Sequence, residues 1–247
     1  MERGVLHGRK MLDLCAGTGS MSGPWLNNGG EVIRIDREDR RIEGLQVIDI
    51  LDHSKRWWSE WVLDNGPFDW VHASPDCKCY SIANSKNIGI NWGPHTGEGH
   101  IWRPYSPEAQ EANDLVEMCI HIAEENARHC FSHGQAWGYW TLENPRGLLR
   151  QMQFMQRHQR TTVTYCQYGD TRQKPTDFWG RFPRSWQGKS CKRGSNCHEP
   201  APRGSNTGTI GLDYEDRIKI PMGIPVELIE KMIQHEGDAW FTLEDWS

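Results

Sequence analysis

The sequence has no apolar run close to the roughly 18 residues that a membrane-spanning helix needs, which predicts a protein without a membrane partner. The segment from Met1 to Leu14 contains Asp13 and lacks both a continuous apolar stretch and a small-residue cleavage site. We therefore expect no secretory signal and a cytoplasmic location. Internal repeats and low-complexity tracts are also missing. The 247 residues, 36% hydrophobic and 25% charged, predict one large folded domain with a small additional lobe.

The net charge of −5 is unevenly distributed along the chain. Residues 146–193 contain 11 lysines and arginines but only two acidic residues, a local charge of +9 that leaves −14 for the rest. This segregation favours a surface that faces a polyanion, although a solvated basic face is the simpler alternative. Eight cysteines in a cytoplasmic protein indicate free thiols, a nucleophile or metal ligands rather than disulfides.

Short apolar runs alternate with amphipathic segments, which is typical of strand, helix and strand units around a parallel sheet. A helix capped by Asp52 should bury Trp58 and Val62. A longer helix should begin at Ser106, and a final helix should follow Pro225. The predicted strands are 10–14, 31–36, 47–50, 68–73, 139–142, 161–165 and 177–179.

Acidic side chains and glycines follow the first predicted strands. The first strand runs into Asp13-Leu14-Cys15-Ala16-Gly17-Thr18-Gly19, Asp36 closes the second and Asp49 the third. Glycines allow a tight turn, and an acid at such a strand end can bind ribose hydroxyls, so we expect a nucleoside crevice. Helix capping is the alternative, most of all for Asp49. Ser22 stands where a dinucleotide fingerprint has its third glycine, which favours adenosylmethionine.

The fourth predicted strand leads to Cys77, at the same edge of the sheet. A cysteine thiolate can add covalently to an electron-poor carbon, and Lys78 next to it would lower its pKa. Cys79 competes for this role. Glu143 ends a later strand and could serve as a general acid facing Cys77.

Six segments, in order along the chain, resemble motifs of the DNA cytosine-5 methyltransferases. Asp13–Gly19 is similar to the Asp-x-Phe-x-Gly-x-Gly cofactor motif, with Cys15 in place of Phe, and Asp36 and Asp49-Ile50 fall where the family binds ribose and adenine. Ser74-Pro75-Asp76-Cys77 is similar to the Pro-Pro-Cys motif, which favours Cys77 over Cys79. The remaining matches are Glu143-Asn144-Pro145 to Glu-Asn-Val, Gln167–Gly180 to the Tyr-Gly and Gln-x-Arg-x-Arg motif, and Lys219–Pro225 to Gln-Ile-Gly-Asn-Ala-Val-Pro.

The resemblance implies a Rossmann-like α/β fold that transfers methyl from S-adenosylmethionine to carbon 5 of cytosine in a flipped base. It implies that Cys77 attacks carbon 6, that Glu143 binds the base, and that Lys174 or Arg172 contacts the cytosine carbonyl. The cofactor-binding residues would be Asp13, Cys15, Ala16, Gly17, Thr18, Gly19, Asp36, Asp49, Ile50 and Pro75, with Asn144 beside the catalytic glutamate. Asp76, Lys78 and Pro145 depart from the family motifs.

The resemblance also predicts a catalytic core over residues 1–180, a target-recognition segment over 181–211 and a returning segment over 212–247. So short a recognition segment suggests a site of two to four base pairs and resembles compact bacteriophage enzymes, which would act as monomers on double-stranded DNA in a bacterial host. The stretches 81–105 and 183–211 lack periodicity and are expected to be functional loops. The expected DNA contacts are Ser81, Asn84, Ser85, Lys86, Arg181, Arg184, Lys189, Lys192, Arg193 and Arg203.

The recognition segment also contains Cys191, Cys197 and His198, which could hold a structural zinc ion with Cys166 or His129 as a further ligand. Free thiols in a polar loop are the alternative. Other readings remain open for the whole chain: a methyltransferase of transfer RNA, a catalytically silent binding module, or transfer of a group other than plain methyl.

Overall fold

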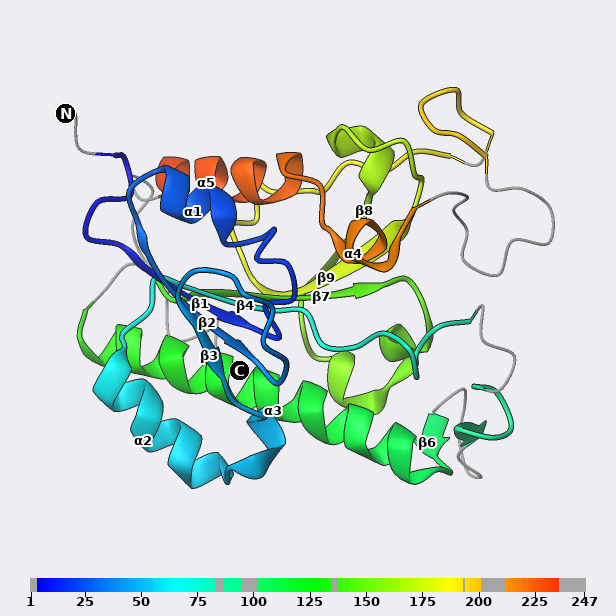
Figure 1. The fold of residues 1–247 in the computed structure, drawn as a ribbon, viewed down its shortest axis with the longest axis horizontal. Helices are drawn as coiled ribbons and strands as arrows, with labels where there is room; N and C mark the ends of the chain where they lie inside the picture. The colour runs from blue at the N-terminus through cyan, green and yellow to red at the C-terminus, as the bar shows by residue number, and fades with distance from the viewer. Residues whose placement is uncertain are drawn as a thin grey trace.

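The computed structural model describes residues 4–82, 87–94, 102–134, 137–192, 194–200 and 212–235. Its centre is a seven-stranded sheet in the order β3-β2-β1-β4-β7-β9-β8, in which only β9 runs antiparallel to its neighbours (Figure 1). This is a Rossmann-like α/β fold with a mostly parallel sheet, as the sequence predicted. The strands are β1 (Lys10–Leu14), β2 (Glu31–Asp36), β3 (Leu45–Val47), β4 (Trp70–Ala73), β7 (Tyr139–Pro145), β8 (Arg160–Thr164) and β9 (Pro175–Arg181).

Helices cover both faces of the sheet (Figure 1). On one face, α2 (Lys55–Asn65) and α3 (Pro107–Ser132) enclose a core that contains the fully buried Trp58. On the other, α1 (Gly23–Asn27) and α5 (Gly223–His235) pack around Trp25. Each helix therefore buries one apolar face against a central sheet that is covered on both sides.

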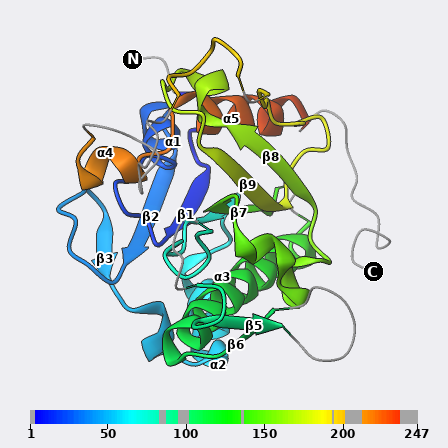
Figure 2. The ribbon, with the colours of Figure 1, turned by 90° about the vertical axis from the view of Figure 1, so that its right-hand side faces the viewer.

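Short elements complete the fold. The helix α4 (Tyr214–Ile218) precedes α5, and the 3-10 turns are η1 (Ile50–Asp52), η2 (Leu148–Gln151), η3 (Gln153–Met155) and η4 (Tyr165–Tyr168). A hairpin of β5 (Trp92–Pro94) and β6 (Trp102–Pro104) lies at one end of α3 (Figure 2). Among the described residues, no helix is long and apolar enough to cross a membrane.

The structure corrects four sequence-based boundaries. The third strand is Leu45–Val47, because Asp49 accepts a hydrogen bond from the Leu51 amide and starts η1 there. The cap of α2 is Ser54, whose hydroxyl accepts from the Trp57 amide, rather than Asp52, which η1 already uses. The last helix begins at Gly223, so that Pro225 occupies its first turn, where a missing amide hydrogen costs little. The expected loop 81–105 contains the β5 and β6 hairpin.

A buried asparagine fastens α3 to the start of β4. Asn126 is fully buried, accepts a hydrogen bond from the Phe68 amide at 2.8 Å and donates one to the Phe68 carbonyl at 2.8 Å. Phe68 lies just before β4, where no neighbouring strand satisfies these two groups. The Asn126 side chain therefore makes the two main-chain hydrogen bonds that a neighbouring strand would otherwise make with Phe68.

We expect Asn126→Ala to lower the free energy of unfolding by about 2 to 4 kcal/mol, because it leaves the Phe68 amide without a partner in the core. Urea unfolding followed by circular dichroism measures this change. Asn65→Ala is the control, since the Asn65 side chain donates to the Trp61 carbonyl of its own helix and the substitution should cost less than about 1 kcal/mol. Equal losses of unfolding free energy in the two variants would contradict a special role for the Asn126 hydrogen bonds to Phe68.

Candidate active site

The parallel register aligns the ends of the central strands. Leu14 of β1 pairs with Ala73 of β4, and Ala73 pairs with Leu142 of β7. The residues that follow these positions, Cys15, Ser74 and Glu143, therefore stand side by side at the carboxyl edge of the sheet. Ligands of open α/β sheets bind at this edge.

The glycine turn after β1 folds back over the end of β2. The Gly17 amide donates to Asp36 Oδ2 at 2.9 Å, and both Gly17 and Gly19 have positive φ angles, 53° and 68°. Cys15 also has a positive φ, 52°, although it is not a glycine. Strained backbone of this kind is concentrated at ligand sites, where the surrounding structure holds it in place.

Asp13 lies beneath this turn. It is almost fully buried, its Oδ2 has no hydrogen-bond partner, and burial raises its pKa to about 7. A buried carboxyl oxygen without a partner costs free energy unless a ligand or water supplies a donor. The position is thus prepared for a donor that arrives with a ligand.

One continuous pocket runs from the glycine turn to Cys77. The end near the turn is lined by acidic and small residues, and the opposite end by a thiol, a carboxyl and an ammonium group. Gly19, Asn144 and Arg172 are not among its lining residues. The lining residues that the sequence predicted are Asp13, Cys15, Ala16, Gly17, Thr18, Asp36, Asp49, Ile50, Pro75, Cys77, Glu143 and Lys174.

Cys77 and Cys79 face different surroundings. Cys77 lines the pocket, whereas Cys79 Sγ contacts the Glu108 carbonyl at 3.6 Å and is absent from the pocket lining. Burial, with the charges of Glu143 and Asp76, raises the pKa of Cys77 to about 11, and Lys174 opposes this shift. The cation that favours the thiolate form of Cys77 is therefore Lys174, whereas Lys78 favours the thiolate form of Cys79. The expected role of Lys78 was wrong, because the cation that lowers the pKa of Cys77 comes from the segment before β9 rather than from the neighbouring position in the sequence.

Glu143 is buried opposite Cys77. Burial raises the pKa of its carboxyl, although Lys174 and a hydrogen bond donated by the Tyr165 hydroxyl at 3.3 Å lower it. Burial also lowers the pKa of Lys174, and Glu143 opposes that shift. A thiol, a carboxyl and an amine with displaced pKa values thus share one end of a pocket, an arrangement typical of proton-transfer sites.

Two neighbours hold these groups in place. The amide nitrogen of Asn144 donates to the Pro75 carbonyl at 3.0 Å, which joins the end of β7 to the turn that carries Cys77. Tyr165 orients Glu143 from η4, and the cationic Nζ of Lys174 lies 4.7 Å from the centre of the Tyr165 ring. Sequence reasoning missed Tyr165, because no local pattern distinguishes it from other core tyrosines.

The structure separates the two cations that the sequence left as alternatives. Arg172 forms an ion pair with Asp170 and donates to the carbonyls of Asp216 and Arg217, so it fastens α4 to the core. Lys174, with a positive φ of 25°, also donates to the Arg217 carbonyl, at 3.2 Å, but unlike Arg172 it lines the pocket. Lys174 rather than Arg172 is therefore positioned to meet a ligand beside Cys77.

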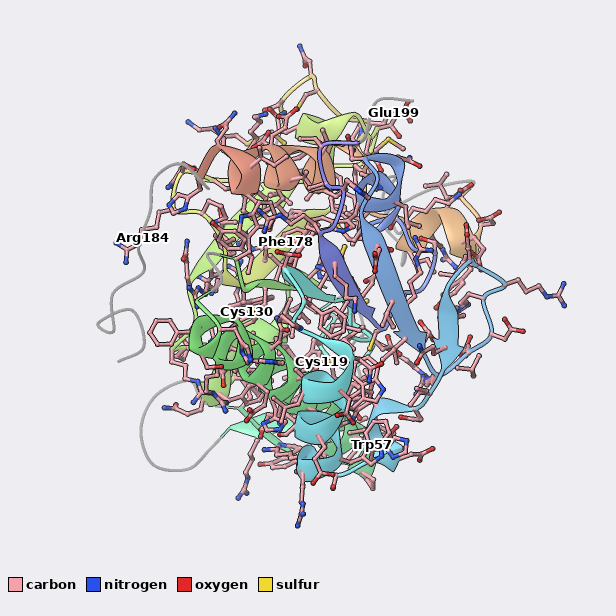
Figure 3. The ribbon with its side chains drawn as sticks, turned by 90° about the vertical axis from the view of Figure 1, so that its left-hand side faces the viewer. Trp57, Cys119, Cys130, Phe178, Arg184 and Glu199 are labelled. Atoms are coloured by element: carbon pink, nitrogen blue, oxygen red, sulfur yellow. The ribbon has the colours of Figure 1, made fainter. Side chains whose placement is uncertain are left out.

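Several expected DNA contacts lie away from the pocket. Arg181 pairs with Trp140 at the start of β7, at the opposite edge of the sheet from Glu143, and Arg184 points outward beyond it (Figure 3). Lys189 forms an ion pair with Glu227, and Lys192 is exposed. Ser81 follows the Cys77 turn, is partly buried and is not among the residues that line the pocket. Asn84, Ser85, Lys86, Arg193 and Arg203 lie outside the described residues.

Ion pairs with other side chains neutralise part of the positive charge of the basic segment 146–193. The bidentate pair of Arg150 with the buried Asp177 lies within the segment and is already included in its charge of +9. Two further cations pair with carboxylates outside the segment, Arg157 with Glu124 at 3.6 Å and Lys189 with Glu227. The charge of +9 therefore overstates what this segment can offer to a polyanion.

The three predicted metal ligands, Cys191, Cys197 and His198, come together, and Cys166 joins them. His129, the other candidate for the fourth ligand, lies on α3 with its ring against His133 and is not part of the group. The structure thus selects Cys166.

No family model and no curated protein matches the chain. Solved structures with a similar fold include a protein assigned as a DNA modification methyltransferase from an E. coli prophage (12% identity, 70% of this chain, 46% of that one, TM-score 0.44). A DNMT2 triple mutant of Spodoptera frugiperda is also similar (16% identity, 75% of this chain, 55% of that one, TM-score 0.42). So is the methyltransferase EhMeth of Entamoeba histolytica (11% identity, 74% of this chain, 57% of that one, TM-score 0.45). The chain spans about half the length of each.

The raised pKa of Cys77 predicts a strong pH dependence for its reaction with iodoacetamide. Because the thiolate fraction grows with pH below the pKa, we expect the rate to rise about tenfold per pH unit between about pH 7 and 9. Peptide mass spectrometry resolves Cys77 from the other cysteines. Lys174→Met should slow the reaction about threefold to tenfold at a given pH by removing the compensating cation, whereas Lys78→Met should not. Equal effects of both variants would contradict this assignment.

Proposed function

We propose that the protein transfers a methyl group from S-adenosylmethionine to carbon 5 of cytosine in DNA, through a covalent bond between Cys77 and carbon 6 of a flipped base. The observation that carries this proposal is the single pocket, which joins a nucleoside-type crevice at Asp36 to Cys77, Glu143 and Lys174. The crevice and the reacting groups must share one cavity if a methyl group is to pass directly from donor to base.

The residues at the glycine turn fit adenosylmethionine. Asp13 offers a buried carboxyl oxygen without a partner, as an incoming ammonium group would require, and Asp36 and Asp49 line the part of the pocket expected to hold the nucleoside. An added Cβ at Gly17 would meet the Cys15 carbonyl oxygen at 3.9 Å, an ordinary van der Waals contact, so the positive φ of 53° rather than crowding is what favours glycine at this turn. When bound there, the cofactor would supply an electrophilic methyl group on a sulfonium sulfur.

The chemistry of the base would rest on three side chains of the chain. Cys77 loses its proton to solvent water and its sulfur bonds to carbon 6, while Glu143 donates a proton to ring nitrogen 3, which makes carbon 5 nucleophilic. Lys174 would stabilise the thiolate and the negative charge that develops at the base carbonyl. After carbon 5 has gained the methyl group, a water molecule takes the carbon 5 proton, the Cys77 sulfur leaves as the thiolate, and the proton on ring nitrogen 3 returns to Glu143, which restores the aromatic ring and the carboxylic acid.

Flipping is needed because carbon 6 is inaccessible within a stacked duplex. Transfer RNA is the alternative substrate, since the same pocket would accept a cytosine from either nucleic acid. The chain is expected to act as a monomer.

We expect methyl transfer to duplex DNA by the wild-type protein, loss of at least about a thousandfold in Cys77→Ser, and a comparable loss in Glu143→Gln. Tritiated adenosylmethionine with mixed-sequence DNA, followed by nucleoside mass spectrometry, measures 5-methylcytosine. Cys79→Ser is the matched control and should keep nearly full activity. If only transfer RNA became labelled, the substrate would be transfer RNA rather than DNA. If Cys79→Ser were the only inactivating cysteine substitution, the nucleophile would be Cys79 rather than Cys77.

The crevice has its own test. Asp36→Ala should weaken adenosylmethionine about 10-fold to 100-fold, because it removes a carboxylate from the crevice and the partner of the Gly17 amide. Isothermal titration calorimetry measures this dissociation constant without any nucleic acid. Asp39→Ala, a nearby position whose carboxylate bonds only an exposed turn, should bind like the wild type. Unchanged affinity in Asp36→Ala would place the cofactor elsewhere.

A further inference from the structure

Four potential metal ligands converge outside the pocket. Cys166 lies in η4, whereas Cys191, Cys197 and His198 lie in the segment after β9. Their ligand atoms all lie within 4.8 Å of one another, and no second group of this kind occurs among the residues that the structure describes. Long-range folding, rather than sequence proximity, has brought Cys166 to the other three.

Four of the six distances between ligand atoms in this group lie close to those of a tetrahedral zinc site, and all six are within 4.8 Å. Zinc bound to sulfur at about 2.3 Å and to imidazole nitrogen at about 2.0 Å holds its ligand atoms about 3.5 to 3.8 Å apart. The Sγ atoms of Cys166 and Cys197 are 3.6 Å apart, and His198 Nδ1 lies 3.5 Å from Cys197 Sγ and 3.6 Å from Cys191 Sγ. The Cys166 and Cys191 sulfurs, at 3.3 Å, are slightly closer.

Neighbouring side chains supply the donors that thiolate ligands require. The side-chain amide nitrogen of Gln173 donates to Cys191 Sγ at 3.4 Å, and the Thr164 hydroxyl lies 3.6 Å from Cys166 Sγ, where it can donate to a thiolate. The Thr164 oxygen also accepts from the Cys191 backbone amide at 2.9 Å, which fixes its position. Such contacts orient the ligands and stabilise negative sulfur, as they do around established metal centres. A disulfide would use only two of the three cysteines and would leave the histidine without a role.

We propose that Cys166, Cys191, Cys197 and His198 bind one structural zinc ion that fastens the segment 189–200 to η4. The described part of this segment has no helix or strand and few apolar side chains, so hydrophobic packing cannot fix its conformation. The adjacent residue Tyr165 hydrogen-bonds Glu143, so the metal would also support a turn that positions the pocket.

Metal analysis of the purified protein tests this directly. We expect about one zinc per chain by inductively coupled plasma mass spectrometry under reducing conditions. Replacement by Co²⁺ should give the intense visible bands of a tetrahedral site with sulfur charge-transfer absorption near the ultraviolet. Less than about 0.1 zinc per chain, together with three freely titrating thiols and no cobalt spectrum, would overturn the proposal. These measurements need no methyl transfer, so they are independent of the proposed function.

Variants identify the ligands. Cys197→Ser and His198→Ala change the exposed side of the cluster and should lower zinc content at least about fivefold, whereas His198→Cys should retain the metal as a four-cysteine site. Cys79→Ser, a cysteine outside the cluster, should keep a full complement. Removal of zinc should speed tryptic cleavage after Lys189 and Lys192 about tenfold or more. Full zinc content in both ligand variants would refute the assignment, as would cleavage that is insensitive to zinc.

Discussion

The shared register of β1, β4 and β7 is the constraint on which the site depends. Parallel pairing places Leu14, Ala73 and Leu142 in one row, so the turns that follow them must meet at one edge. A shift of one strand by a single residue would turn its side chains to the opposite faces of the sheet. The buried aromatic and aliphatic cores on both faces oppose such shifts and thereby preserve the pocket.

Charge compensation makes this pocket tolerable to the fold. An isolated buried carboxylate or ammonium group is costly, but Glu143 and Lys174 each favour the charged form of the other. Lys174 occupies its position with an uncommon backbone conformation, which the pairing of β9 with β7 and β8 holds in place. Cys77 remains a neutral thiol at rest, which limits the net charge buried beside them.

Sequence reasoning located the strands and the crevice because both depend on local patterns. Apolar runs marked the strands, and acids and glycines at their ends marked the turns. It failed where the outcome depended on competition or distance. Ser54 rather than Asp52 caps α2. Lys174 rather than Lys78 is the cation that lowers the pKa of Cys77, although it lies almost 100 positions away along the chain. Charge counting also overstated the free positive charge of residues 146–193, because Glu124 and Glu227, outside the segment, pair with Arg157 and Lys189.

The sequence by itself determined the alternating α/β architecture, the order of the turns at the sheet edge and the identity of the residues with chemical potential. Only the tertiary structure decided which of them meet: Lys174 rather than Arg172 at the pocket, and Cys166 rather than His129 beside the other two cysteines. The physical reason is that periodicity encodes which face of an element is buried, whereas the direction of a side chain at a turn depends on contacts between segments far apart in the chain.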